Sequence, residues 1–597
     1  MKPIVYPLIV LVSFFVACKT PNKETLDQLV DEASFETEEL EANLERRLAD
    51  TTYLNQFRFG DTLYNFYEER NFKPVWALLM VDDSTADVIL QPFANAAYEG
   101  FNSDYYRLPE ISNILENLKK GKKSELYDEL VHLEMLTSDN MLSLHSDRVW
   151  GRTDPVKVFD GAYHLPRREF PDFKLFDILH AKRYTQVFAE NELQDTAYIK
   201  LKEMLAVYVN RIKSGEEWAM IDTTGIKKLE PGDTTTLMPL IAQKLHEMQV
   251  ISEAEMKEAD SNQYPKSFAK YIRRFQQRFG LYDDAILGRR TFGLLNISLQ
   301  DRANEVSANM ERIRWFKLPE EKPYVSVNLP FFELTLHYED SIQKMATCIG
   351  KPRKHDYNDR MERYKKEGKA WLRPPDHETP QIYSKIAYMV INPTWTVPTS
   401  IVTREMWWKM KTDSHYLADA GYGVFYKKKE IRSDTINWRK FNPRKLPFEI
   451  VQKSGEANAL GKVKFIFPNK YSIYLHDTPQ KSKFSWTGRA VSHGCVRVED
   501  PVLLGEFVTQ NIDTMDSDDF RIHMGYKPRD PIRLEEYDPE DSTAHIQPID
   551  ETHVVWLNKR MPVFFLYRTI AFSEDWEVQY RNDVYDKNRL IIKAMSF

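Results

Sequence analysis

Cysteine is scarce in this chain: its 597 residues contain three, Cys18, Cys348 and Cys495. With so few cysteines, disulfides cannot stabilise the fold of a protein of this length. No CxxC or HExxH pattern occurs either, so the usual zinc-binding motifs are missing and we expect no metal and no cofactor. Disulfide frameworks and zinc modules are therefore excluded as explanations of the fold.

Basic residues do not outnumber acidic residues in this chain. The formal net charge is −7, so the chain has no broad positive field and we expect no nucleic-acid partner. Hydrophobic residues make up 42% and charged residues 29%, which is typical of a water-soluble protein. The length alone predicts roughly three or four domains.

The first twenty residues read MKPIVYPLIVLVSFFVACKT. The apolar run from Ile4 to Ala17 follows Lys2 and is too short for a membrane-spanning helix. A short apolar run behind a positive charge is typical of an export signal. We therefore expect residues 1–17 to be a signal peptide, and an uncleaved hydrophobic tail is the alternative.

Cys18 follows small Ala17 at the end of that run. The sequence FVAC is similar to a bacterial lipobox, with Phe15 in place of the usual Leu. The resemblance implies lipidation of Cys18 and a lipid-anchored tether over residues 18–48. The expected location is outside the cytoplasm, as a membrane-anchored lipoprotein that faces the periplasm.

Residues 49–229 carry mostly helical patterns, such as LYDELVHLEMLTSDNMLSLHSDRVW, and no catalytic constellation. We expect a helical scaffold domain there. The pair Pro231-Gly232 breaks the pattern and predicts a domain boundary near residue 230.

Residues 230–297 hold two helical patterns and then the segment GLYDDAILGRRTFGLLN. This arrangement resembles the small three-helix peptidoglycan-binding module. Ala285 stands where that family usually has Gly. The alternative is a plain helical subdomain without a ligand.

From Lys322 onward, apolar and polar residues alternate in strand-like runs such as PYVSVNLPFFELTLH and KVKFIFPN. The pattern predicts a mostly-β domain over 322–528. It is interrupted by a charged segment, 354–378, predicted to be a loop, and by a helix-like insertion that we expect to form a lid over about 400–450. Residues 529–597 are assigned to a C-terminal extension.

The segment YLHDTPQKSKFSWTGRAVSHGCVRVEDP, residues 474–501, has the residue types that thiol catalysis requires. A thiol nucleophile needs a base, donors for the developing oxyanion and a rigid mount. His476 ends a strand-like run, and Gly494 allows a sharp turn before Cys495. The alternative without a catalytic role is that the histidine is simply buried and the thiol packed in the core.

HDTP followed by SHGCVRV resembles the signature of the L,D-transpeptidases of the YkuD type, and fifteen residues lie between His476 and Ser492, a spacing that fits it. The segments INPTWTVPTSI and GEANALGKVKFIFPN are similar to other parts of the large exported members. The resemblance implies a multidomain α+β protein. It would have a helical scaffold, a peptidoglycan-binding module and a mostly-β catalytic domain with an inserted helical lid.

The resemblance also implies roles for residues around the thiol. Cys495 is the expected nucleophile and His476 the expected proton donor and acceptor, oriented through a backbone carbonyl near Asp477. His493 is the rival base or an orienting residue. Ser492 and Gly494 are expected to shape the oxyanion turn.

Three further residues are candidates for substrate binding. Arg497 is expected either to pair with a substrate carboxylate or to form a structural ion pair. Trp395 and Tyr474 are candidate wall residues, and an ordinary core position is the alternative for Tyr474. Cys348 lies in an apolar strand-like run, where a small buried thiol is expected.

The function implied by the resemblance is peptidoglycan L,D-transpeptidation. Cys495 would form a thioester with a tetrapeptide stem, release D-Ala and pass the acyl group to an acceptor amine, which makes a 3→3 cross-link. The expected partners are peptidoglycan stem peptides and glycan, the membrane through the N-terminal lipid, and carbapenem-type inhibitors. Two alternatives stay open: hydrolysis of the same acyl-enzyme as an L,D-carboxypeptidase, and a catalytically silent wall-binding lipoprotein.

Overall fold

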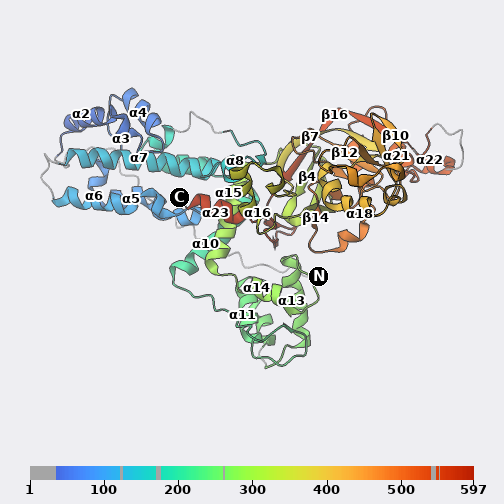
Figure 1. Ribbon diagram of the computed structural model, residues 1–597. Helices are drawn as coiled ribbons and strands as arrows, with labels where there is room; N and C mark the ends of the chain where they lie inside the picture. Colours follow the sequence, from blue (N-terminus) through green and yellow to red (C-terminus); the bar gives the residue numbers. More distant parts are fainter. Residues whose placement is uncertain are drawn as a thin grey trace.

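The computed structural model describes residues 35–120, 126–169, 176–259, 262–538, 546–549 and 551–596. The expected signal peptide and Cys18 lie outside these ranges. Figure 1 shows a long helical part at one end, a sheet-rich part at the other, and a smaller helical part below their junction. The protein is thus a multidomain α+β chain with a helical N-terminal region and a mostly-β C-terminal region. None of the described helices has the length and apolarity needed to cross a bilayer.

The scaffold helices surround one central helix, α7 (Tyr127–Trp150), whose side chains are buried along most of its length. The others are α2 (Thr37–Leu48), α3 (Thr51–Leu54), α4 (Gly60–Glu69), α5 (Asp83–Ala94), α6 (Leu108–Lys120), α8 (Pro155–Val158) and α9 (Tyr184–Glu190). Helix α10 (Thr196–Lys213) follows them and packs instead on α15 (Leu299–Trp315). The buried carboxylate of Glu134 accepts hydrogen bonds from the amides of Val75, Trp76 and Ala77 and from the Tyr67 hydroxyl, at 2.6–2.8 Å. These bonds fix the loop before α5 on the central helix, because a buried carboxylate is tolerated only where donors satisfy it.

The module below consists of α11 (Met238–Glu247), α12 (Glu253–Met256), α13 (Ala269–Arg278) and α14 (Arg289–Leu295), with β2 (Lys228–Leu229) paired to β3 (Leu287–Gly288). Tyr271, Ile272 and Phe275 on α13 point into its core. Ala285 has a φ of 64°, a left-handed conformation that favours glycine. The turn thus keeps the backbone shape of a glycine turn although this chain has alanine there.

Helix α15 (Leu299–Trp315) leaves this module and runs between the parts, packed against α10, α7 and α23 (Lys587–Met595). Its side chains are mostly buried and contribute to the cores of both the scaffold and the module. This helix therefore joins the scaffold and the module by belonging to both cores.

The sheet of the C-terminal region closes on itself. Its strands follow the order β7-β12-β13-β15-β6-β5-β4-β16, and β16 also pairs with β7. Their bounds are β4 (Tyr324–Asn328), β5 (Glu333–His337), β6 (Ile342–Gly350), β7 (Gln381–Ile391), β12 (Val463–Ile466), β13 (Leu475–His476), β15 (Val496–Val498) and β16 (His553–Leu566). Strand β14 (Ala490–Ser492) lies beside β6 off this path, and β1 (Tyr163–His164) adds to β7.

Strand β16 comes from the segment assigned to a C-terminal extension, and it supplies the pairing that closes the sheet between β4 and β7. After it, the hairpin β17 (Ile570–Phe572) and β18 (Val578–Tyr580) touches the module, and α23 packs on α15 and α8. Helices α20 (Pro501–Thr509), α21 (Ser517–His523) and α22 (Pro531–Glu536) complete this region. The segment 354–378 contains helix α16 (Tyr357–Glu367), so the prediction of a plain loop there is wrong.

The insertion contains helices α17 (Thr399–Ile401), α18 (Trp407–Thr412) and α19 (Tyr416–Asp419), and the π-helical turn η11 (Val402–Met406). It also holds a sheet of four strands, β8 (Trp395–Thr396), β9 (Tyr422–Tyr426), β10 (Lys429–Ile431) and β11 (Glu449–Gln452). Met406, Met410 and Val424 are among the residues that form its own buried core. The insertion that is expected to form a helix-like lid is thus a small packed unit of both helices and strands.

Candidate active site

The register of β13 and β15 divides their residues between two faces. Leu475 pairs with Val496, and both side chains are buried in the core of the sheet. Because side chains alternate along a strand, Tyr474, His476, Cys495 and Arg497 belong to the opposite face. His476 lies next to Arg497 on one side and Lys464 on the other. The structure therefore brings Cys495 and His476 to one face of two neighbouring strands.

Cys495 and Cys348 are both free thiols, Cys348 buried and Cys495 only partly so. Burial raises the pKa of the Cys495 thiol. Hydrogen bonds from the amide and hydroxyl of Tyr474 and the positive charges of Arg497 and Lys464 act in the opposite direction on this pKa. The thiol is therefore neutral at rest, and the groups that would stabilise a thiolate already surround it.

His476 is 5% exposed, and its Nδ1 lies 2.5 Å from the carbonyl oxygen of Asp477. A carbonyl only accepts, so Nδ1 carries the proton and Nε2 keeps a free lone pair. Burial, followed by the charge of Arg497, lowers the pKa of His476 to about 3. The imidazole is therefore neutral and able to accept a proton at Nε2.

The turn before the thiol is fixed by Ser492 and Gly494. Gly494 has a φ of 128°, a region that other residues rarely adopt. The Ser492 hydroxyl donates to the carbonyl of Cys495 at 2.6 Å and accepts from the amide of Gly494 at 3.1 Å. The Gly494 amide is therefore engaged within the turn, which leaves the amide of Cys495 as the candidate oxyanion donor.

His493 contacts the lid. Its Nε2 lies 2.6 Å from a carboxylate oxygen of Glu405 in η11, and its ring stands edge-on to that of His377, with 4.9 Å between the centroids. His476 lies instead on the sheet face shared with the thiol. This placement favours His476 as the base and gives His493 a contact with the lid.

Arg497 donates to the side-chain oxygen of Gln480 at 3.0 Å and forms no ion pair with any carboxylate of the described residues. Its buried Nε has no hydrogen-bond partner in the described part of the chain. A structural ion pair is thus not what Arg497 provides. Trp395 lies at the base of the lid in β8, against the lid core, and Tyr474 is 5.6 Å from the His476 ring between centroids.

Residues 322–524 match the family model of the L,D-transpeptidase catalytic domain, YkuD. The chain carries an L,D-transpeptidase catalytic domain. Residues 61–205 match the family model of a scaffold domain. A protein of Haemophilus influenzae named "Putative L,D-transpeptidase" is 37% identical over 122 residues, which are 20% of this chain and 24% of that protein. The matched segment thus spans about a quarter of that relative.

The turn that carries Cys495 is held by residues that no local motif indicates. The Thr379 hydroxyl donates to the Gly494 carbonyl at 2.8 Å and accepts from the Gly350 amide at 2.9 Å. The Tyr585 hydroxyl donates to the Gly350 carbonyl at 2.7 Å and accepts from the Thr379 amide at 3.2 Å. A residue 90 positions beyond Cys495 therefore braces the turn through Gly350 and Thr379.

Lys464 is another residue that sequence reasoning missed. It lies opposite His476 in the register, and burial lowers its pKa. A lysine alternating with the apolar residues Val463 and Phe465 was the available signal, because a charged side chain in such a strand has to face away from the core. Among the described residues, no three His, Cys, Asp or Glu side chains gather as they would around a metal ion.

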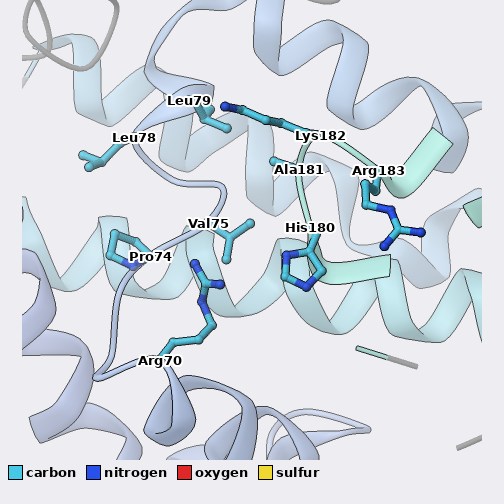
Figure 2. Close-up of a pocket in the computed structure, with 9 residues that line it drawn as sticks. All are labelled: Arg70, Pro74, Val75, Leu78, Leu79, His180, Ala181, Lys182 and Arg183. Atoms are coloured by element: carbon cyan, nitrogen blue, oxygen red, sulfur yellow. The ribbon is translucent and has the colours of Figure 1, made fainter. Parts of the chain in front are cut away.

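A separate pocket of about 470 Å³ lies in the scaffold (Figure 2). Pro74, Val75, Leu78, Leu79 and Ala181 form its apolar part, and Arg70, His180, Lys182 and Arg183 its basic part. Among the described residues that line it there is neither a thiol nor a carboxylate, so these residues do not pair a nucleophile with a base. The site residues of the L,D-transpeptidase domain lie elsewhere.

Proposed function

We propose that this protein is a cysteine-dependent peptidoglycan L,D-transpeptidase that makes 3→3 cross-links. The observation that carries the proposal is the placement of Cys495 and His476 on one sheet face, with Nδ1 of His476 held by the Asp477 carbonyl and Nε2 free. Nucleophilic thiol catalysis needs this combination of a thiol, a neutral imidazole and a fixed ring orientation.

The first half-reaction is acylation. The Cys495 thiol gives its proton to Nε2 of His476 as Sγ attacks the carbonyl between the third and fourth residues of a tetrapeptide stem. The amide of Cys495 donates to the oxyanion of the tetrahedral intermediate. His476 then returns the proton to the leaving amine, D-Ala departs, and a thioester remains on Sγ.

The raised pKa of the thiol and the lowered pKa of His476 suit this order of events. Both groups are neutral before the substrate arrives, so a standing charge pair need not be desolvated. The proton moves only as the oxyanion forms. Arg497, which lacks a carboxylate partner among the described residues, would then bind a carboxylate of the substrate.

The second half-reaction is transfer. A side-chain amine of a neighbouring stem attacks the thioester, loses its proton to His476, and expels the Cys495 thiolate, which is reprotonated. Water in place of the amine would give a tripeptide, as in an L,D-carboxypeptidase. The lid contact between Glu405 and His493 supports transfer, because a closed lid excludes water from the acyl-enzyme.

The remaining parts fit an exported wall enzyme. The module of residues 230–297 would bind peptidoglycan, and lipid on Cys18 would hold the chain at a membrane facing the periplasm. Cys18 lies outside the described residues. Labelling with an alkyne-bearing fatty acid tests this anchoring: the intact chain should be labelled and Cys18→Ala should not.

Product analysis tests the enzymatic proposal. Purified chain is incubated with disaccharide-tetrapeptide, and the products are separated and fragmented by mass spectrometry. Dimers with a 3→3 bond are expected from the intact chain and none from Cys495→Ala, with Cys348→Ala as the matched control that keeps activity. Full activity of Cys495→Ala would refute the proposal, and tripeptide without dimers would make the enzyme a carboxypeptidase.

A further inference from the structure

The thiol of Cys495 has a neighbour that the catalytic steps do not involve. Its Sγ lies 3.8 Å from the carbonyl oxygen of Ser472, within the range of a weak S–H···O hydrogen bond. A carbonyl oxygen accepts from a thiol but repels a thiolate, so this contact orients Sγ and favours the protonated form. Ser472 belongs to a turn of residues 469–473 between β12 and β13, which we call the Asn469 turn.

The Asn469 turn is shaped by the side chain of Asn469. Its amide nitrogen donates to the carbonyls of Phe467 and Ile473 at 2.9 and 2.7 Å, and its oxygen accepts from the amides of Tyr471 and Ile473 at 3.0 and 3.1 Å. Within this frame Ser472 has a φ of 56°, a left-handed conformation that is uncommon outside glycine. The position of the Ser472 carbonyl is therefore set by the turn as a whole, and a group that holds the turn also holds the acceptor of the thiol.

Tyr471 connects the Asn469 turn to the scaffold. Its hydroxyl oxygen lies 2.7 Å from Nε2 of His164 and 3.4 Å from the carbonyl oxygen of Gly161, and both partners belong to the segment that matches the scaffold model. The rings of Tyr471 and His164 also contact each other, with 5.5 Å between their centroids. Burial, followed by the charge of Lys470, lowers the pKa of His164. The imidazole therefore stays neutral across the pH range in which a thiol titrates.

The scaffold side of this contact is firmly placed. His164 and Tyr163 form β1, which pairs in parallel with the start of β7. Tyr163 is 3% exposed and packs on Phe159 and Trp315 in the scaffold core. Because successive side chains along a strand point to opposite faces, His164 points away from this core, toward Tyr471.

Strand β1 also borders the other support of the nucleophile. Tyr163 pairs with Gln381, two residues beyond Thr379, whose hydroxyl donates to the Gly494 carbonyl at 2.8 Å. One scaffold strand therefore lies next to both supports of Cys495, the residues that hold its backbone turn and the Asn469 turn that contacts its Sγ.

We propose that the scaffold positions the nucleophile: the contact of His164 with Tyr471 fixes the Asn469 turn, and the Ser472 carbonyl of this turn holds Sγ oriented and protonated. His164, Tyr471 and Asn469 are positioning residues, because they act through the Ser472 carbonyl and touch no reacting atom. The inference rests on the proposed role of Cys495 as the nucleophile and adds the scaffold to the parts that determine its reactivity.

The test follows alkylation of Cys495 by iodoacetamide in the full-length chain from about pH 6 to 10, by mass spectrometry of the peptide that contains this residue. Tyr471→Phe removes the hydroxyl that contacts His164 and keeps the ring. The Ser472 carbonyl then no longer holds the thiol proton, so the midpoint of the pH profile should fall by about 0.5–1 unit. His164→Ala should shift the midpoint by a similar amount. A change that merely destabilises the fold would leave this midpoint in place.

Tyr338→Phe is the matched control. It also removes a tyrosine hydroxyl from the L,D-transpeptidase domain, one that donates to Gln343 at 3.1 Å between β5 and β6, and it should leave the midpoint where it is. His164→Ala and Tyr471→Phe remove the same contact, so their combination should shift the midpoint no further than either change alone. A midpoint in Tyr471→Phe equal to that of the control overturns the proposal, as does an additive shift in the double variant.

A second readout separates this inference from the proposed function. Acylation of Cys495 by a carbapenem should slow by about tenfold in Tyr471→Phe, because attack on the inhibitor needs an oriented Sγ. An unchanged acylation rate overturns the positioning role and, where the unaltered chain makes 3→3 dimers, leaves the proposed function standing. If the unaltered chain is not acylated and makes no dimers, the proposed function fails, while a shifted alkylation midpoint still supports the positioning role.

Discussion

Replacing Tyr585 by phenylalanine should slow acylation of Cys495 although the two residues are 90 positions apart. The change removes one hydroxyl and keeps the ring. It leaves the Gly350 carbonyl and the Thr379 amide without their partner, and both groups are in buried positions. Each orphaned buried group costs about 1–3 kcal/mol, so the free energy of unfolding should fall by about 2–6 kcal/mol.

Part of this loss of stability should appear as a displacement of the turn that carries Cys495. Thr379 holds the Gly494 carbonyl directly, so a shift of Thr379 moves the backbone that carries the nucleophile. Misplacement by about 1 Å costs up to roughly 100-fold in rate. We expect Tyr585→Phe to lower the rate of carbapenem acylation, measured by stopped-flow absorbance, by about 10-fold, and Thr379→Val to do the same.

Tyr67→Phe is the matched control. It also removes a buried tyrosine hydroxyl, one bonded to Glu134 and Ser138 at 2.6 Å, but in the scaffold. It should lower the melting temperature and leave the acylation rate as it is. If Tyr585→Phe is destabilised but acylates at the original rate, or if Tyr67→Phe slows acylation equally, the reasoning about the brace is wrong.

Three further predictions concern the site itself. Tyr474→Phe removes a hydroxyl that donates to Sγ of Cys495, so the pKa of the thiol should rise further. Alkylation of Cys495 by iodoacetamide at pH 8 should then slow by about 3- to 10-fold, and an unchanged rate contradicts this hydrogen bond. The pKa of His476 is lowered to about 3, against 6.5 in the unfolded chain, so the unfolded chain takes up the proton first as pH falls. The stability due to this group is therefore fully present above pH 6.5 and is lost toward pH 3, by about 1.4 kcal/mol per pH unit. In His476→Gln, the free energy of unfolding in urea should depend less steeply on pH across this range. Glu405→Gln weakens the lid contact to His493, so the ratio of dimer to tripeptide should fall, and a constant ratio would show that this contact does not restrict water.

The sequence predicted the parts of the site that are close together in the chain. The spacing of His476, Ser492 and Cys495 drew attention to one segment, and the structure places its members on two neighbouring strands and the turn between them. The glycine before the thiol signalled the sharp turn that its φ of 128° now describes. These signals are local, because they depend on residues within about twenty positions.

The supporting contacts could not be predicted in this way. Thr379 and Tyr585 stand in segments without a motif, and they bond Gly494 and Gly350, which lie far from them in the sequence. The charged sequence of helix α16 predicts a loop because it has little apolar periodicity: Tyr357 is the only buried residue of this helix. Long-range closure and solvent-exposed helices leave little trace in a single sequence.

Mapping of the acyl group tests the central claim most directly. The chain is mixed with disaccharide-tetrapeptide, quenched in acid, digested and analysed by mass spectrometry. The account predicts a gain equal to the donor minus D-alanine on the peptide that contains Cys495, with no gain on the peptide of Cys348 and none in Cys495→Ala. An acyl group on another residue, or 3→3 dimers formed by Cys495→Ala, would contradict it.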